Sequence, residues 1–230
     1  MNELVLSSAT IGVVLSIGAY EIGVFLKKKT NSAIFNPLLV SIILVMVFLV
    51  IFRIDYESYN DSAKYLSYLL TPATVSLAIP LYQQLELLKK NFTAIILGIL
   101  SGVLTSAGVI LAMSILFGLS HEEYVTLLPK SITTAIGMGV SEELGGYVTI
   151  TVAVIIVTGI LGNIIGEVVC KVFRIKNPIS RGLALGTSAH AIGTAKAMEM
   201  GEVEGAMSSL AIVVAGLCTV IGASVFAMLW

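Results

Sequence analysis

The sequence predicts an all-α fold, a polytopic bundle of membrane helices with internal repeats and interrupted helices. Hydrophobic residues fill 57% of its 230 positions, charged residues fill 12%, and the mean hydropathy is +1.00. A soluble domain does not need so much apolar sequence, whereas a chain that crosses a bilayer several times does. Five apolar runs have roughly the 20 residues that one crossing requires, and they cover residues 4–26, 33–52, 92–118, 147–170 and 205–229.

Three further segments are apolar but interrupted by prolines, repeated glycines, hydroxyl side chains and charges. They cover residues 62–88, 125–146 and 181–203. Broken backbone is tolerated at membrane depth only where protein or a wet cavity satisfies its hydrogen-bonding groups. We therefore expect these segments to line a polar site, and the sequence leaves open whether they cross the membrane or re-enter it.

A short pattern occurs once in each interrupted segment: an Ala-Ile pair followed by a glutamate seven residues after the Ile. The three copies are Ala78-Ile79 with Glu86, Ala135-Ile136 with Glu143, and Ala191-Ile192 with Glu199. The last two copies align without a gap at an offset of 56 residues (187 − 131). The first copy has Pro80 after its Ala-Ile pair, where the other two copies have Gly. We expect a single domain, 1–230, with repeat units at about 71–118, 131–174 and 187–230, as in duplicated transporters.

Basic residues predict the topology of the chain. Lys27 to Lys29 follow the first apolar run instead of preceding it, which indicates a retained helix and not a cleaved signal peptide. Loops rich in Lys and Arg tend to be cytoplasmic, and the basic loops here lie at 27–29, 89–90 and 171–181. The N-terminus is then outside, and the first and second repeat units are inverted relative to each other.

Several classes of function have no support in the sequence. Cys170 and Cys218 lie in apolar segments without a metal-ligand pattern, so we expect neither a disulfide framework nor a metal site. Because there is no phosphate-binding loop, no Gly-x-Ser-x-Gly and no basic tract with interleaved aromatics, we expect no cofactor, no nucleotide-driven transport and no nucleic-acid partner. No nucleophile with an identifiable base emerges, so we expect no catalytic residue and no enzyme.

The candidate site lies between residues 131–143 and 187–199, near the bilayer midplane. A helix that breaks at glycine exposes N–H groups that attract an anion, and nearby hydroxyls add hydrogen-bond donors. The expected substrate-binding residues are Ser131, Thr133, Thr134, Thr187, Ser188, His190, Gly193, Thr194 and Lys196. Proton coupling, if present, would use Glu143, Glu199 or His190.

Each of these residues also has a purely structural interpretation. Lys196 and Glu199 share a helix face with Ile192, so the lysine can form an ion pair with the glutamate. His190 can cap a broken helix through a hydrogen bond, and the hydroxyl residues can serve helix packing. Arg181, in a basic loop, is better explained as a topology anchor.

Two strings of residues carry a family resemblance. LLPKSITTAIGMGVSEELGG at 127–146 and RGLALGTSAHAIGTAKAMEMGEVEGAMSSLAI at 181–212 resemble the LrgB/CidB family. The resemblance implies a single LrgB-like domain in the bacterial inner (cytoplasmic) membrane, described as antiholin-like or as a regulator of murein hydrolase export and autolysis. It also implies a smaller LrgA/CidA-type membrane partner. Plant relatives look like plastid glycolate/glycerate transporters, and some bacterial relatives are linked to pyruvate uptake.

The chain departs from this family pattern at two positions. Relatives commonly have Pro where this chain has Ala135, and Arg where it has Lys196. Because of the first departure, the shape of the helix break at Ala135 need not match that of the relatives. The second keeps the charge but loses the planar fork that holds a carboxylate through two parallel hydrogen bonds.

The sequence therefore favours a secondary transporter of small monocarboxylates such as glycolate, glycerate or pyruvate. The alternative is an antiholin-like regulator of a holin-type partner and of murein hydrolase activity, without transport of its own. We expect the partners to be a small carboxylate, an LrgA/CidA-type protein, the lipid bilayer and further copies of the chain in a homo-oligomer.

Overall fold

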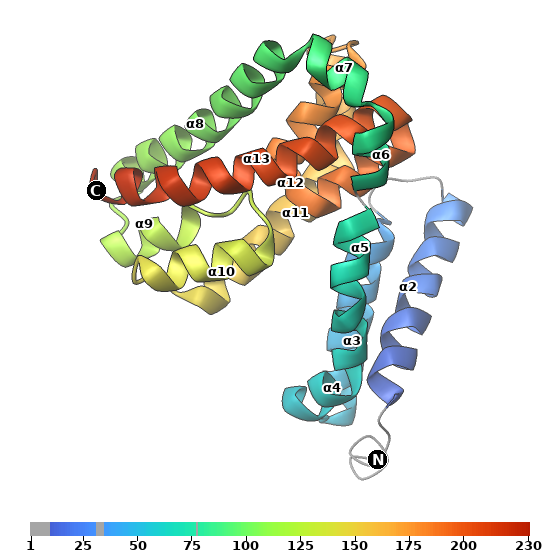
Figure 1. The fold of residues 1–230 in the computed structure, drawn as a ribbon. Coiled ribbons are helices and arrows are strands. Elements are labelled where there is room, and N and C mark those ends of the chain that lie inside the picture. The colour runs from blue at the N-terminus through green and yellow to red at the C-terminus, as the bar shows by residue number, and fades with distance from the viewer. Residues whose placement is uncertain (1–9, 31–34, 77) are drawn as a thin grey trace. The chain divides into compact units, whose positions relative to one another are not determined.

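The structure is a computed structural model that describes residues 10–30, 35–76 and 78–230. Within these ranges every regular element is helical, which confirms the predicted all-α class. Packing divides the chain into two compact units, Met1–Ser76 and Leu77–Trp230 (Figure 1). The predicted repeat unit at 71–118 extends across this boundary, whereas the other two lie within the second compact unit.

The first compact unit is built on two packed helices, α2 and α3. Asn36 starts α3 because its side-chain oxygen accepts hydrogen bonds from the N–H groups of Leu38 and Leu39, at 2.9 and 3.2 Å. The helices approach closely at Gly23, where an added Cβ would lie 2.7 Å from the Pro37 carbonyl oxygen. The elements are α2 (Ile11–Thr30), α3 (Pro37–Phe52), α4 (Tyr56–Ala63), the 3-10 helix η1 (Lys64–Leu69) and α5 (Leu70–Ser76).

The second compact unit contains three long apolar helices and the shorter pieces between them. α8, α11 and α13 are long and apolar enough to span a membrane, as predicted from their sequences. The predicted spans 4–26 and 33–52 begin outside the described residues, which hold α2 and the 16-residue α3 in those regions. The elements of this unit are α6 (Ala78–Gln83), α7 (Leu85–Lys90), α8 (Phe92–Phe117), α9 (His121–Leu127), α10 (Thr134–Glu143), α11 (Val148–Val172), α12 (Pro178–Met200) and α13 (Glu202–Ala227).

Helices α8 and α13 run in the same direction, and α11 runs against them (Figure 1). The indole N–H of Trp230 donates to the Leu119 carbonyl at 2.9 Å, so α8 and α13 end at the same side of the unit. The last turns of α11 lie at the opposite side, because Glu167 pairs with Lys196, near the start of α13. The spanning helices of the second and third repeat units are therefore antiparallel.

Helix α12 folds back on itself as a hairpin. A straight helix of its 23 residues would be roughly 34 Å long at about 1.5 Å per residue. However, Arg181 near its start and Glu199 near its end line one and the same pocket. The chain turns at Ala189 and His190, where φ is −130° and +42°, and it then packs Gly193 against the Leu185 carbonyl. Both ends of α12 thus lie at the side where α13 begins.

Helices α9 and α10 form a second hairpin, which starts from the other side of the unit. Thr126 at the end of α9 accepts a hydrogen bond from the N–H of Tyr147 at 2.8 Å, just before α11 begins. Between the two arms, the tip at residues 128–133 reaches α8 near its middle, where the Ser131 and Ser106 hydroxyl oxygens lie 3.2 Å apart. The two hairpins therefore approach each other from opposite ends of the unit.

The helix bounds agree with the offset of 56 between the second and third repeat units. Helix α10, at 134–143, corresponds to 190–199 (134 + 56, 143 + 56), which is the second arm of α12 after its break. Helix α11, at 148–172, corresponds to 204–228, close to α13 at 202–227. The origin of these units by duplication stays a prediction.

Thr151 attaches the first hairpin to α11, and replacing it should loosen that attachment. Its buried hydroxyl lies 2.9 Å from the Thr126 carbonyl oxygen and 2.7 Å from the Ser141 hydroxyl. We expect Thr151→Val to lower the free energy of unfolding by about 1–3 kcal/mol, because it leaves buried polar atoms without partners. Thermal unfolding of the detergent-solubilised protein measures this change. Thr149→Val, the same substitution at an exposed position of α11, is the control, and equal losses would contradict the prediction.

Candidate functional site

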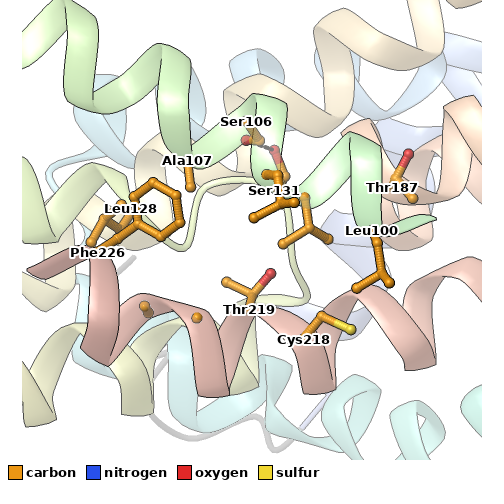
Figure 2. Close-up of a pocket in the computed structure, with 13 residues that line it drawn as sticks. Leu100, Ser106, Ala107, Leu128, Ser131, Thr187, Cys218, Thr219 and Phe226 are labelled. Carbon is orange, nitrogen blue, oxygen red and sulfur yellow. Dashed lines mark hydrogen bonds between the residues drawn. The ribbon is translucent and has the colours of Figure 1, made fainter. Parts of the chain in front are cut away.

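A cavity lies where the two hairpins approach each other between α8 and α13. Its volume is about 130 Å³, well below the roughly 300 Å³ at which pockets for drug-sized ligands begin, so it suits a molecule of a few heavy atoms. The walls are mainly apolar, with four hydroxyl side chains among them (Figure 2). The lining residues are Leu100, Val103, Leu104, Ser106, Ala107, Leu128, Ser131, Thr187, Cys218, Thr219, Gly222, Ala223 and Phe226.

The four hydroxyls come from four different elements. Ser106 belongs to α8, Ser131 to the tip of the first hairpin, Thr187 to the first arm of α12, and Thr219 to α13. The Thr187 hydroxyl donates to the Leu183 carbonyl of its own helix at 2.7 Å, so its proton is already used. Thr219 makes no hydrogen bond with any described residue, and Figure 2 shows its oxygen directed into the space between α8 and α13. Thr219 and the Ser106–Ser131 pair are thus the hydroxyls best placed to bind a ligand.

Lys130 lies beside this cavity. Its ammonium donates to the Ser131 hydroxyl oxygen at 2.9 Å, and its side chain is half-buried. A lysine held in this way brings a positive charge within one hydrogen bond of the cavity wall. Lys130 is not among the substrate-binding residues that the sequence predicts, although it lies in the interrupted segment 125–146.

His190 lies at the turn of the α12 hairpin and is almost fully buried. Its Nε2 lies 3.0 Å from the Ile155 carbonyl oxygen, and because a carbonyl only accepts, Nε2 carries the proton. Thr194 donates to the His190 carbonyl at 3.0 Å, and its oxygen lies 2.7 Å from the Ser208 hydroxyl. These contacts tie the turn to α11 and α13, which favours the capping interpretation of His190.

Lys196 lies in a different pocket, at the end of the unit where α12 begins and ends. Its ammonium is 3.1 Å from Glu167 and 3.4 Å from Glu199, which confirms the pairing that the helical spacing predicts. Arg181 lines the same pocket of about 280 Å³ and forms a 3.8 Å salt bridge with Glu204. Lys196 therefore does not line the cavity that contains Ser131 and Thr187.

The remaining predicted residues are not among those that line the cavity. Thr133 and Thr134 are half-buried at the start of α10, and Glu143 is exposed at the end of that helix. Ser188 is exposed and donates to the Ala184 carbonyl at 2.6 Å. Gly193 is buried because the backbone of the first arm crosses close to it. Roles of these residues in substrate binding or proton coupling stay predictions.

Sequence reasoning missed Ser106, Thr219 and Lys130. Ser106 and Thr219 lie inside long apolar helices that each contain several other hydroxyl residues, so the sequence does not single them out. Thr219 also corresponds to Asn163 at the repeat offset (163 + 56 = 219), so both spanning helices have a polar residue at this level. Their meeting at one cavity depends on the two hairpins, which no local pattern reveals.

Comparisons with known proteins bear on the whole chain. The model of the LrgB-like family matches residues 16–229. An antiholin-like protein LrgB of Bacillus subtilis (strain 168) is 41% identical over 219 residues, which is 95% of each chain. Antiholin-like proteins LrgB of Bacillus mycoides (strain KBAB4) and Bacillus cereus (strain B4264) are each 41% identical over 211 residues, covering 91% of this chain and 92% of theirs. No solved structure matches.

Proposed function

The chain belongs to the LrgB-like family, and we propose that within this family it is a multi-pass membrane carrier of small monocarboxylates. The observation that carries the proposal is the cavity where the tips of two oppositely directed hairpins meet. Secondary carriers commonly place their substrate at broken helices near the bilayer midplane. A regulator that acts only through its surface has no need of such a cavity.

The arrangement suits alternating access to one site. The first hairpin lies between the cavity and the side where α8 and α13 end, and α12 lies between the cavity and the side where α13 begins. Movement of one hairpin at a time would open the cavity to one side while the other hairpin keeps it closed. The size and the hydroxyls of the cavity favour a small hydroxy or keto acid. The proposal includes proton coupling through Glu143, Glu199 or His190. It includes no catalysed reaction.

The names of the relatives favour a second function more directly than they favour transport. The curated relatives are named antiholin-like proteins, and this chain matches them over nearly its full length. On this second proposal, the chain regulates a holin-type membrane protein of the LrgA/CidA class, and through it murein hydrolase activity. Contacts with this partner, or with further copies of the chain, would then use the exposed apolar helix faces and not the cavity.

Uptake into proteoliposomes that contain only this protein tests the carrier directly. We expect saturable uptake of labelled glycolate and pyruvate, with each acid suppressing uptake of the other. An inward proton gradient should increase uptake if protons are coupled. Linear leakage, or uptake no greater than in empty liposomes, would contradict a carrier that works alone. The assay is then repeated with liposomes that also contain the LrgA/CidA-type partner. If these liposomes show no uptake either, the regulatory function is the one that remains.

A further inference from the structure

Lys130 is a half-buried cation that has no carboxylate partner in the described part of the chain. Its ammonium has three N–H donors, and its one hydrogen bond goes to the neutral hydroxyl of Ser131. The other cations of the hairpins are compensated: Lys196 by Glu167 and Glu199, and Arg181 by Glu204. A positive charge at membrane depth is costly unless an anion or water compensates it. Lys130 therefore differs from the other hairpin cations in being available to a ligand.

The surroundings of Lys130 lead directly to the cavity. Ser131 accepts the lysine's hydrogen bond, and its oxygen also lies 3.2 Å from the Ser106 oxygen, at the cavity wall. Helix α10 begins three residues later, and its N-cap Thr133 makes no side-chain hydrogen bond to the described first turn. The N-terminal dipole of this ten-residue helix adds positive potential at the tip.

We propose that Lys130 is the cation that holds the substrate's carboxylate in this cavity, an inference that rests on the proposed carrier function. A carboxylate only accepts hydrogen bonds, so the ammonium and the Ser106–Ser131 pair match it as donors. Thr219, on the facing helix α13, then meets the α-hydroxyl or keto oxygen of the same molecule. One cation neutralises one carboxylate, which makes the site selective for monocarboxylates.

Binding of glycolate and of its neutral amide, glycolamide, tests this role. The full chain is purified in detergent, and both affinities are measured by isothermal titration calorimetry. We expect the wild type to prefer glycolate. Lys130→Met should weaken glycolate binding by about 10- to 100-fold, the cost of losing a charged hydrogen bond, without weakening glycolamide binding. Lys130→Arg should keep the preference for the charged ligand.

Lys196→Met is the matched control, because it removes the cation that the sequence selected and that the structure pairs with two carboxylates. We expect it to keep the preference for glycolate. Thermal unfolding shows which variants fold. If Lys130→Met does not fold, Ser131→Ala replaces it in the test, because it removes the hydroxyl that positions the ammonium. Ser131→Ala should weaken the binding of glycolate but not of glycolamide. Retained preference in Lys130→Met, or its loss in Lys196→Met alone, would overturn the assignment. A wild type that binds neither glycolate nor pyruvate would instead refute the proposed function.

Discussion

Gly222→Leu is expected to abolish monocarboxylate uptake while the protein stays folded. Gly222 lines the cavity, and a Cβ added there would meet no atom within 4 Å. The Cβ of a leucine therefore fits without displacing a neighbour, and we expect the rest of the side chain to occupy much of a cavity of about 130 Å³. Because Gly222 lies within helix α13, the substitution also favours the helix by roughly 0.5–1 kcal/mol. Uptake of labelled glycolate into proteoliposomes measures the loss.

Gly108→Leu is the matched control for the blocked cavity. Gly108 also lies in a spanning helix and also has no atom within 4 Å of an added Cβ, but it does not line the cavity. It should keep uptake near the wild-type rate. If Gly222→Leu transported normally, the cavity would not be the substrate site. If both variants were inactive although folded, the loss would come from leucine in a spanning helix and not from the cavity.

Gly186→Ala is expected to destabilise the protein strongly, although alanine is the better helix former. A Cβ at Gly186 would lie 2.5 Å from the Ser208 carbonyl oxygen and 2.7 Å from the Ala211 Cβ, both on α13. These are atoms of a packed helix, so the first arm of α12 and α13 would have to separate. Small residues allow this close contact, and it is a main source of stability between membrane helices.

We expect the overpacking in Gly186→Ala to cost about 1–3 kcal/mol or more, visible as a lower unfolding temperature in detergent. Gly108→Ala isolates the opposing propensity effect, because its Cβ meets nothing within 4 Å, and it should raise stability slightly. Equal unfolding temperatures for the two variants would show that α12 and α13 do not pack as described here.

The helices α8, α11 and α13 were predictable because each is a long apolar run, and composition alone specifies such a run. The interruptions at 125–146 and 181–203 were also predictable, since glycines, hydroxyls and charges mark them. Their folding into hairpins was not predictable, because it depends on where Ser131 meets Ser106 and on the reversal at His190. These are contacts between distant residues and a backbone turn that a non-glycine residue rarely adopts.

The candidate site was predictable only in part, for a related reason. Ser131 and Thr187 lie at the cavity as expected, because they are close to the two tips. Lys196 has the helical spacing of an ion pair with Glu199, and that local interaction is what the structure contains. Residue type alone does not distinguish Lys130 from Lys196. The difference lies in which carboxylates the fold brings near each ammonium.

The two hairpins also determine which helix ends of the second compact unit lie on the same side. Each hairpin returns to the side from which it starts, and among the described helices of this unit the candidate membrane spans are α8, α11 and α13. Three candidate spans therefore separate Lys89, just before α8, from Trp230, just after α13, and we expect each of them to cross the bilayer once. A reporter fused after Trp230 would then lie in the opposite compartment from a cysteine introduced at Lys89. Membrane-impermeant labels applied to intact cells would reach one of these positions and not the other.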